Sequence, residues 1–143
     1  MNVILRNILA VIAGVLVGGV VNMAIVTLGP ALIPPPSGVD VTDADSVAQG
    51  IRLFEPRHFI APWLAHALGT LVGALVAWLL AKARRDTMAY VVGVLFLCGG
   101  IAAAFMIAAP AWFIATDLLL AYLPMAWLAT RIGRALRRPV PQQ

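Results

Sequence analysis

The chain has 143 residues, of which 62% are hydrophobic and only 11% are charged, and its mean hydropathy is +0.97. A soluble domain is about 45–50% apolar and about 25% charged, so this composition excludes an ordinary soluble fold and predicts one domain surrounded by lipid. The net charge of +4 does not predict a nucleic-acid partner, because the basic residues flank apolar segments and form no aromatic stacking surface.

Four apolar segments each approach the roughly 20 residues that cross about 30 Å of hydrocarbon. We expect membrane-spanning helices at about residues 7–28, 59–81, 88–109 and 112–130. They predict an all-α membrane protein, a four-helix bundle that forms a single transmembrane domain over residues 1–143. The first segment is too long for the apolar region of a signal peptide, so we expect it to be retained.

Basic residues are distributed unequally between the two ends of this predicted bundle. Eight lie on the side that holds both termini and the turn between the second and third segments, whereas only Arg52 and Arg57 lie on the other side. We name the first side the basic end, with Arg6, Lys82, Arg84, Arg85, Arg131, Arg134, Arg137 and Arg138. Because cytoplasmic loops are enriched in lysine and arginine, both termini are expected on the cytoplasmic side.

The outer loop, residues 29–57, is the longest connection between predicted spans. It contains three consecutive prolines at 34–36, which favour a stiff extended conformation. Apolar residues then recur at helical spacing and predict a short amphipathic helix, with a stripe formed by Ala44, Val47, Ile51 and Phe54. This stripe is too short to span a bilayer, and it suits either a spacer on the membrane surface or a lid or docking element.

Small residues recur at every fourth position on the first two predicted helices. The first ridge includes Gly14 and Gly18, and the second includes Gly69 and Gly73. Residues four apart share one helix face, and in lipid such flat faces favour close packing of helices. The ridges therefore predict either packing inside the bundle or contact with another subunit.

Polar residues on three predicted helices share one depth. Asn22 lies eight residues before Pro30, His66 lies eight after His58, and Asp117 lies seven after Pro110, which places all three roughly 10–12 Å below the outer surface. Thr70 and Tyr122 lie deeper on the same segments. Buried polar groups need partners, so His66 and Asp117 are expected to pair as a structural contact or to line a pocket for a cation, a proton or a small polar ligand. A third alternative has Asp117 reaching the outer interface.

No catalytic pattern accompanies this polar cluster. The predicted spans contain no serine, and no P-loop, dinucleotide-binding turn or HExxH motif is present. A zinc site would need three or four ligands, which the spacing of the histidines, the lone Cys98 and Asp117 does not supply. We therefore expect no enzyme activity, no cofactor and no metal.

Three stretches resemble an uncharacterised family of small bacterial four-helix membrane proteins. They are Ile33–Asp40 (IPPPSGVD), His58–Ala74 (HFIAPWLAHALGTLVGA) and Ala111–Ala126 (AWFIATDLLLAYLPMA). The resemblance implies a multi-pass protein of the bacterial inner membrane and adds no activity. His66 and Asp117 fall inside two of the three stretches.

Two functions are compatible with these features. The ridges favour a protein that acts by helix association, with membrane lipid around it, as a homo-oligomer or as an accessory subunit beside another membrane chain. The polar cluster favours a small transporter or channel whose outward-facing site uses His66 and Asp117.

Overall fold

The computed structural model describes residues 2–107 and 109–137, and all regular secondary structure in this part of the chain is helical. In chain order the elements are α1 (Val3–Leu32), α2 (Ala44–Gly50), the 3₁₀ turns η1 (Ile51–Leu53) and η2 (Pro56–Phe59), α3 (Ile60–Leu80), α4 (Arg85–Met106), α5 (Ala111–Leu120) and α6 (Leu123–Leu136). Ala108, in the predicted third helix, and Arg138, in the predicted basic end, lie outside the described residues.

Four helical stretches in the described residues are long and apolar enough to cross a membrane, which makes the chain a multi-pass membrane protein. They are Val3–Leu32, Pro56–Leu80, Arg85–Met106 and Ala111–Leu136. The first extends beyond the predicted 7–28 at both ends, because the Asn2 side chain caps its start and Pro30 lies within its last turn without ending it. The third begins earlier than predicted, directly after Arg84 in a left-handed conformation at φ 48°.

The structure divides the fourth span, predicted at 112–130, into α5 and α6, although the whole stretch Ala111–Leu136 is long and apolar enough to cross a membrane. Tyr122 sits at the break with φ −119° and ψ −79°, outside the regular helical range. Pro124 follows in the first turn of α6, where its ring removes one backbone donor and crowds the preceding turn. The break therefore lies within the membrane-spanning stretch and brings Tyr122 next to Asp117.

The two glycine ridges lie against each other in the contact between α1 and α3, the most extensive pair of elements in the fold. A Cβ atom added to Gly14 would lie 2.5 Å from the carbonyl oxygen of Gly73, and one added to Gly18 would lie 2.5 Å from that of Gly69. In the other direction, a Cβ atom added to Gly69 would lie 2.9 Å from the carbonyl oxygen of Gly18, and one added to Gly73 would lie 2.7 Å from that of Gly14. Only glycine allows the two backbones to approach this closely.

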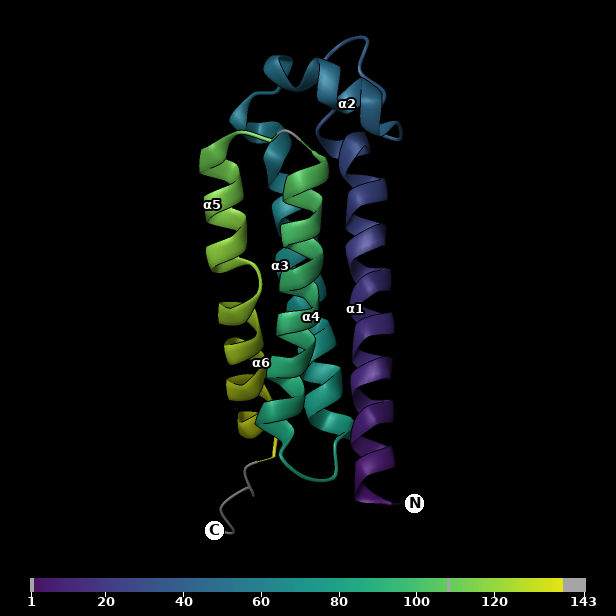
Figure 1. The fold of residues 1–143 in the computed structure, drawn as a ribbon, viewed down its shortest axis with the longest axis vertical. Coiled ribbons are helices and arrows are strands. Elements are labelled where there is room, and N and C mark those ends of the chain that lie inside the picture. The colour runs from purple at the N-terminus through teal and green to yellow at the C-terminus, as the bar shows by residue number, and fades with distance from the viewer. Residues whose placement is uncertain (1, 108, 138–143) are drawn as a thin grey trace, which may run out of the picture.

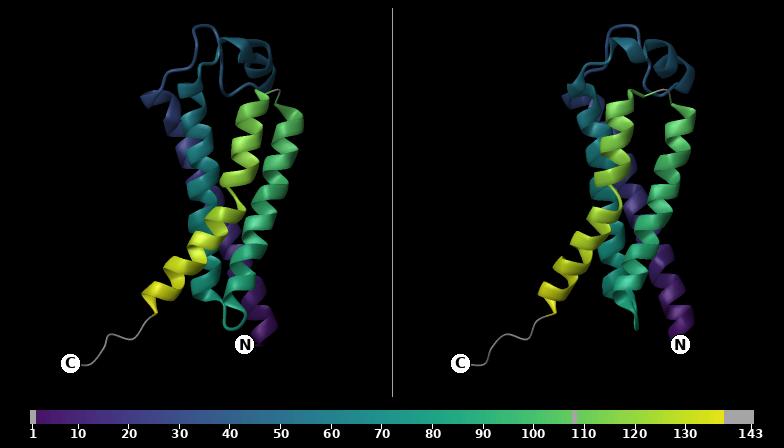
Figure 2. Two further views of the ribbon diagram at one scale, coloured as in Figure 1. Left: turned by 90° about the vertical axis from the view of Figure 1, so that its left-hand side faces the viewer. Right: turned by 60° about the vertical axis from the view of Figure 1, so that its left-hand side comes forward.

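The core is densest toward the basic end, where α3 packs against α1, α4 and α6. Its fully buried members are small apart from Trp78 and Val92, so the helices approach one another closely. α1 begins and α6 ends at this end of the bundle, and α2 with its flanking loop covers the opposite end (Figure 1). We call the covered end the loop end. Figure 2 shows α6 diverging from the axis of α5 below the break.

Gly18→Ala is expected to lower the free energy of unfolding by about 1–3 kcal/mol, because the new methyl group overlaps the α3 backbone. Gly19→Ala is the matched control, since a Cβ there meets no heavy atom within 4 Å. Thermal unfolding of the detergent-solubilised chain, followed by tryptophan fluorescence, should place the Gly18→Ala midpoint clearly below both wild type and Gly19→Ala. Equal midpoints for the two variants would contradict the close approach.

Candidate functional site

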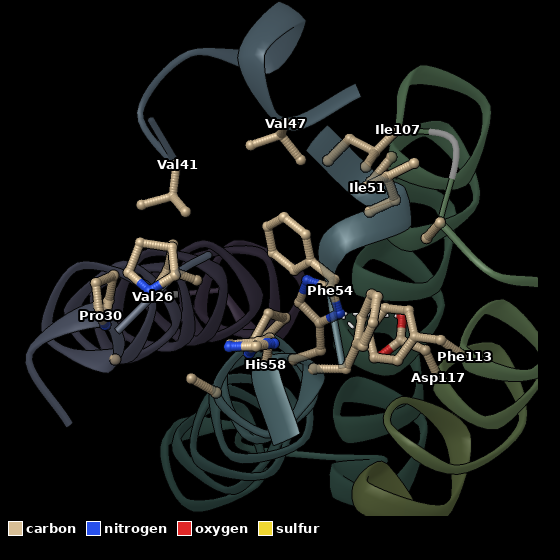
Figure 3. Close-up of a pocket in the computed structure, with 18 of the residues that line it drawn as sticks. Val26, Pro30, Val41, Val47, Ile51, Phe54, His58, Ile107, Phe113 and Asp117 are labelled. Carbon is tan, nitrogen blue, oxygen red and sulfur yellow. Dashed lines mark hydrogen bonds and ion pairs between the residues drawn. The ribbon is translucent and has the colours of Figure 1, made fainter. Parts of the chain in front are cut away.

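A chamber of about 560 Å³ lies between the helices at the loop end. This volume falls within the roughly 300–1,000 Å³ of small-molecule sites. Figure 3 shows Val26 and Pro30 of α1 across the chamber from Phe113 and Asp117 of α5. Residues of α3 and α4 complete the wall, so all four membrane-spanning stretches shape the space.

The stripe predicted in the outer loop lies over this chamber. Val47, Ile51 and Phe54 all line it, although the regular helix α2 ends at Gly50 and the stripe continues through η1 (Figure 3). Phe54 packs against Phe59 with ring centroids 5.9 Å apart. Phe59 in turn lies 4.7 Å from Phe113. Aromatic contacts therefore connect the loop to both α3 and α5.

Local hydrogen bonds give the loop a defined shape above the chamber. The Asp43 side chain accepts from the backbone N–H of Asp45 and caps α2. Asp40 accepts from the hydroxyl and the backbone N–H of Thr42, and these bonds, the side-chain bond first, hold the pKa of Asp40 below its usual value. The Asp40 N–H donates to the Ser46 hydroxyl, which ties the turn to α2.

The inner wall of the chamber carries its main polar group, the pair formed by His66 and Asp117. Nδ1 of His66 lies 2.9 and 3.0 Å from the two carboxylate oxygens of Asp117. The Tyr122 hydroxyl donates to Oδ2 of the same carboxylate at 2.8 Å. Asp117 is 4% exposed and Tyr122 is 1% exposed, so each finds in the other the partner that a buried polar group requires.

The tautomer of His66 follows from this contact. A carboxylate only accepts hydrogen bonds, so Nδ1 carries the proton that faces Asp117. Nε2 is then the ring nitrogen left for a ligand, and the His66 side chain, 24% exposed, contributes to the chamber wall. An imidazole oriented by a carboxylate in this way can accept a hydrogen bond or a proton at Nε2.

The other predicted cluster residues take different positions. Asn22 is half-buried on α1 and lines a second cavity of about 340 Å³ together with His66 and Tyr122, without a hydrogen bond to Asp117 among the described residues. Thr70 is fully buried, and its hydroxyl donates to the carbonyl of His66 one turn earlier at 2.7 Å. The structure thus joins His66, Asp117 and Tyr122, places Asn22 beside them, and leaves Thr70 bonded to its own helix.

The alternative in which Asp117 reaches the outer interface is wrong, because its carboxylate is buried and points to His66 and Tyr122. Sequence reasoning also missed the role of α4. Gly100 and Ala103 line both cavities, and Gly100 lies directly against the Tyr122 ring. The run of small residues on this segment was the only signal, and it carries no polar chemistry.

The charge of the chamber is unusual for a basic protein. Among the described residues no lysine or arginine lines it, and the ionisable residues that do are His58, His66 and Asp117. His58 is held in place at the loop end, where its Nδ1 accepts from the backbone N–H of Glu55 at 2.8 Å. Among the described residues no three histidine, cysteine or acidic side chains come together in a group that could hold a metal ion. The arrangement suits an apolar molecule with one hydrogen-bond donor.

Gly100→Ala is expected to displace the Tyr122 ring, since a Cβ there would lie 2.5 Å from the Tyr122 Cζ atom, and so to break the bond to Asp117. It should lower the free energy of unfolding by about 1–3 kcal/mol, through overlap and loss of the hydrogen bond. Gly99→Ala is the control, because a Cβ there meets nothing within 4 Å.

Tyr122→Phe removes the same hydrogen bond without overlap, so a double-mutant cycle with Gly100→Ala should be non-additive by about 0.5 kcal/mol or more. Thermal unfolding of the four proteins in one detergent measures this coupling. Additive effects would show that Gly100 does not act through Tyr122.

Comparison with known proteins identifies no relative from which a role could be transferred: no family model, no curated protein and no solved structure matches the chain. The interpretation of the chamber therefore rests on its own geometry. That geometry consists of an apolar space at the loop end and a histidine oriented by a buried carboxylate.

Proposed function

We propose that the chain is a protein of the bacterial inner membrane with both termini in the cytoplasm and the chamber facing outward. The excess of basic residues at the end where α1 begins supports this orientation, because arginine and lysine are retained on the cytoplasmic side. The resemblance to small bacterial four-helix membrane proteins supports the compartment. In this orientation the loop from Ile33 to Glu55 lies outside the cytoplasm.

Accessibility labelling tests the orientation. In a Cys98→Ala background, Ser37→Cys should react with a membrane-impermeant maleimide in intact spheroplasts, since the loop is exposed on the outer side. Lys82→Cys, in the turn between α3 and α4, should react only after the membrane is opened. The reverse pattern would show that the bundle has the opposite orientation. Equal labelling of the two cysteine variants in intact spheroplasts would contradict a single orientation.

We propose further that the chamber binds a small molecule with an apolar body and one amine group. The observation that carries this proposal is the composition of the chamber: in the part of the chain that the structure describes, its wall is largely apolar, with one buried carboxylate and no basic residue other than the two histidines. An amine can donate to Nε2 of His66, and the Asp117 carboxylate on the far side of the imidazole ring favours its positive charge. An anion would meet a carboxylate instead and lose its hydration without compensation.

A matched series of adamantane compounds tests the ligand class, since all share one apolar body that a chamber of about 560 Å³ accommodates. We expect 1-adamantanamine to bind more tightly than 1-adamantanol, and adamantane-1-carboxylate to bind weakest. Asp117→Asn should weaken amine binding at least about tenfold, because hydrogen bonds to charged groups contribute about 1.5–3 kcal/mol. Isothermal titration calorimetry in mild detergent measures each affinity.

Asp45→Asn is the control, because Asp45 is an exposed carboxylate at the start of α2, outside the chamber lining. It should leave all three affinities unchanged. Equal binding of the amine and the carboxylate by wild type would refute the ligand class, as would equal losses in Asp45→Asn and Asp117→Asn. Uptake of the same amine into liposomes containing the protein then distinguishes a transporter from a binding protein.

Transport is the second candidate function, and the break between α5 and α6 favours it. Interrupted helices in transporters place their broken ends at the substrate site, and here Tyr122 at the break contacts the carboxylate of Asp117. Toward the basic end, Ala77, Trp78 and Ala126 are buried in the core. Release to the cytoplasm would therefore need α6 to move relative to α3.

Association of the chain with a second copy or with another membrane subunit stays a prediction, and the glycine ridges no longer support it. Gly14, Gly18, Gly69 and Gly73 pack α1 onto α3 within one chain, so the two ridges cover each other. A homo-oligomer or an accessory complex would have to use another face, such as the exposed apolar side of α1.

A further inference from the structure

Basic side chains surround Trp78 at the basic end of the bundle, opposite the chamber. Trp78 lies near the end of α3, is 5% exposed, and packs against α6 at Gly133, where an added Cβ would lie 2.5 Å from the indole ring. The guanidinium carbon of Arg85 lies 5.2 Å from the ring centroid, and that of Arg137 lies 5.7 Å from it. Such cation–π contacts hold two positive charges on one side chain.

A third guanidinium comes from α1. Nε of Arg6 donates to the carbonyl of Leu80 at 3.0 Å, and Nη2 of Arg137 donates to the carbonyl of Leu79 at 3.0 Å. The end of α3 attracts them because the last carbonyls of a helix carry partial negative charge. We name Arg6, Arg85 and Arg137 the arginine cluster; its members come from three different parts of the chain.

The arginine cluster keeps most of its hydrogen-bonding capacity. A guanidinium has five N–H donors, and the bonds to the α3 carbonyls engage one donor on Arg6 and one on Arg137 within the described residues. Asp86 is the one acidic residue of the sequence near this end, and it already accepts from the Trp78 indole at 2.7 Å and from Arg134. Arg6 and Arg137 are exposed and Arg85 is half-buried, so the three neighbouring positive charges remain accessible with donors to spare.

We propose that the arginine cluster binds the phosphodiester group of an anionic phospholipid. Guanidinium groups present paired donors that match phosphate oxygens, and they lie where the spans end and lipid headgroups begin. Ile4, Leu80 and Leu136 are large apolar side chains at the same end, each exposed, and they provide a surface for acyl chains. Free phosphate would use the guanidinium groups and leave this apolar surface without a role.

Native mass spectrometry of the full chain in mild detergent tests the proposal with phosphatidylglycerol and phosphatidylcholine of identical acyl chains. Wild type should retain phosphatidylglycerol in clear preference to phosphatidylcholine. Arg85→Gln and Arg137→Gln should each weaken that retention about fivefold, the effect of about one basic contact to an anionic lipid. If Arg85→Gln does not fold, Arg85→Lys replaces it, since lysine keeps the charge but loses the planar fork and should still reduce retention.

Lys82→Gln and Arg131→Gln are charge-matched controls at the same end: Lys82 lies in the α3–α4 turn, and Arg131 stacks on Trp127 rather than Trp78. Both should keep retention within about twofold of wild type, because neither belongs to the cluster. Equal losses in all four variants would show a general attraction of the basic end and overturn the proposed site. Absence of a phosphatidylglycerol preference, or displacement of the lipid by millimolar inorganic phosphate, would overturn it as well.

Discussion

The burial of one carboxylate constrains the whole half of the bundle at the loop end. Asp117 is placed among apolar helices, where an unsatisfied charge would cost several kcal/mol, so it must be met by donors from other parts of the chain. His66 supplies one from α3, and Tyr122 supplies another from the residue at the α5–α6 break. The position of α5 relative to α3, the course of the chain through the break and the orientation of the His66 ring all follow from satisfying this single group.

The two ends of the bundle differ because small and large residues are distributed unequally along the helices. Gly14 and Gly18 let α1 approach the backbone of α3, and alanines at the core positions of α3 and α6 keep that region closed. Toward the loop end the facing residues no longer close the space: α1 contributes Val26 and Pro30 to a wall rather than to a packed interface. The chamber is the consequence, and the loop covers it with the apolar stripe that would otherwise be exposed to water.

Hydropathy was sufficient to predict the four spans, since each needs only an apolar run of the right length. Counting depth from the loop end also placed His66 and Asp117 at one level, and the structure joins them by hydrogen bonds. The sequence could not reveal the break at Tyr122, because Pro124 is equally compatible with a kinked but continuous helix. It could not assign Asn22 and Thr70 either, because depth says nothing of the direction in which a side chain points around the helix.

The contribution of α4 was hidden for a related reason. Gly100 matters because it makes room for the Tyr122 ring, and a vacancy leaves no chemical pattern in a sequence. An added Cβ at the neighbouring Gly99 would meet no atom within 4 Å, yet the sequence alone does not distinguish the two glycines. The rotation of α4 about its own axis decides which of the two glycines faces the Tyr122 ring. That rotation is set by contacts with residues distant in the sequence.

The charges of the two ends act in opposite senses on a bound cation. At the loop end the ionisable groups of the chamber, over residues 2–107 and 109–137, are a carboxylate and two histidines, which favours entry of a positive molecule. At the basic end the arginines repel the same molecule, and Trp78 and its alanine neighbours are buried in the core there. Passage toward the basic end would need these packed residues to separate. If the chain moves a cation across the membrane, it must do so by rearranging α6 at the break, and the anionic headgroup proposed at the arginine cluster would lower the repulsion that opposes that final step.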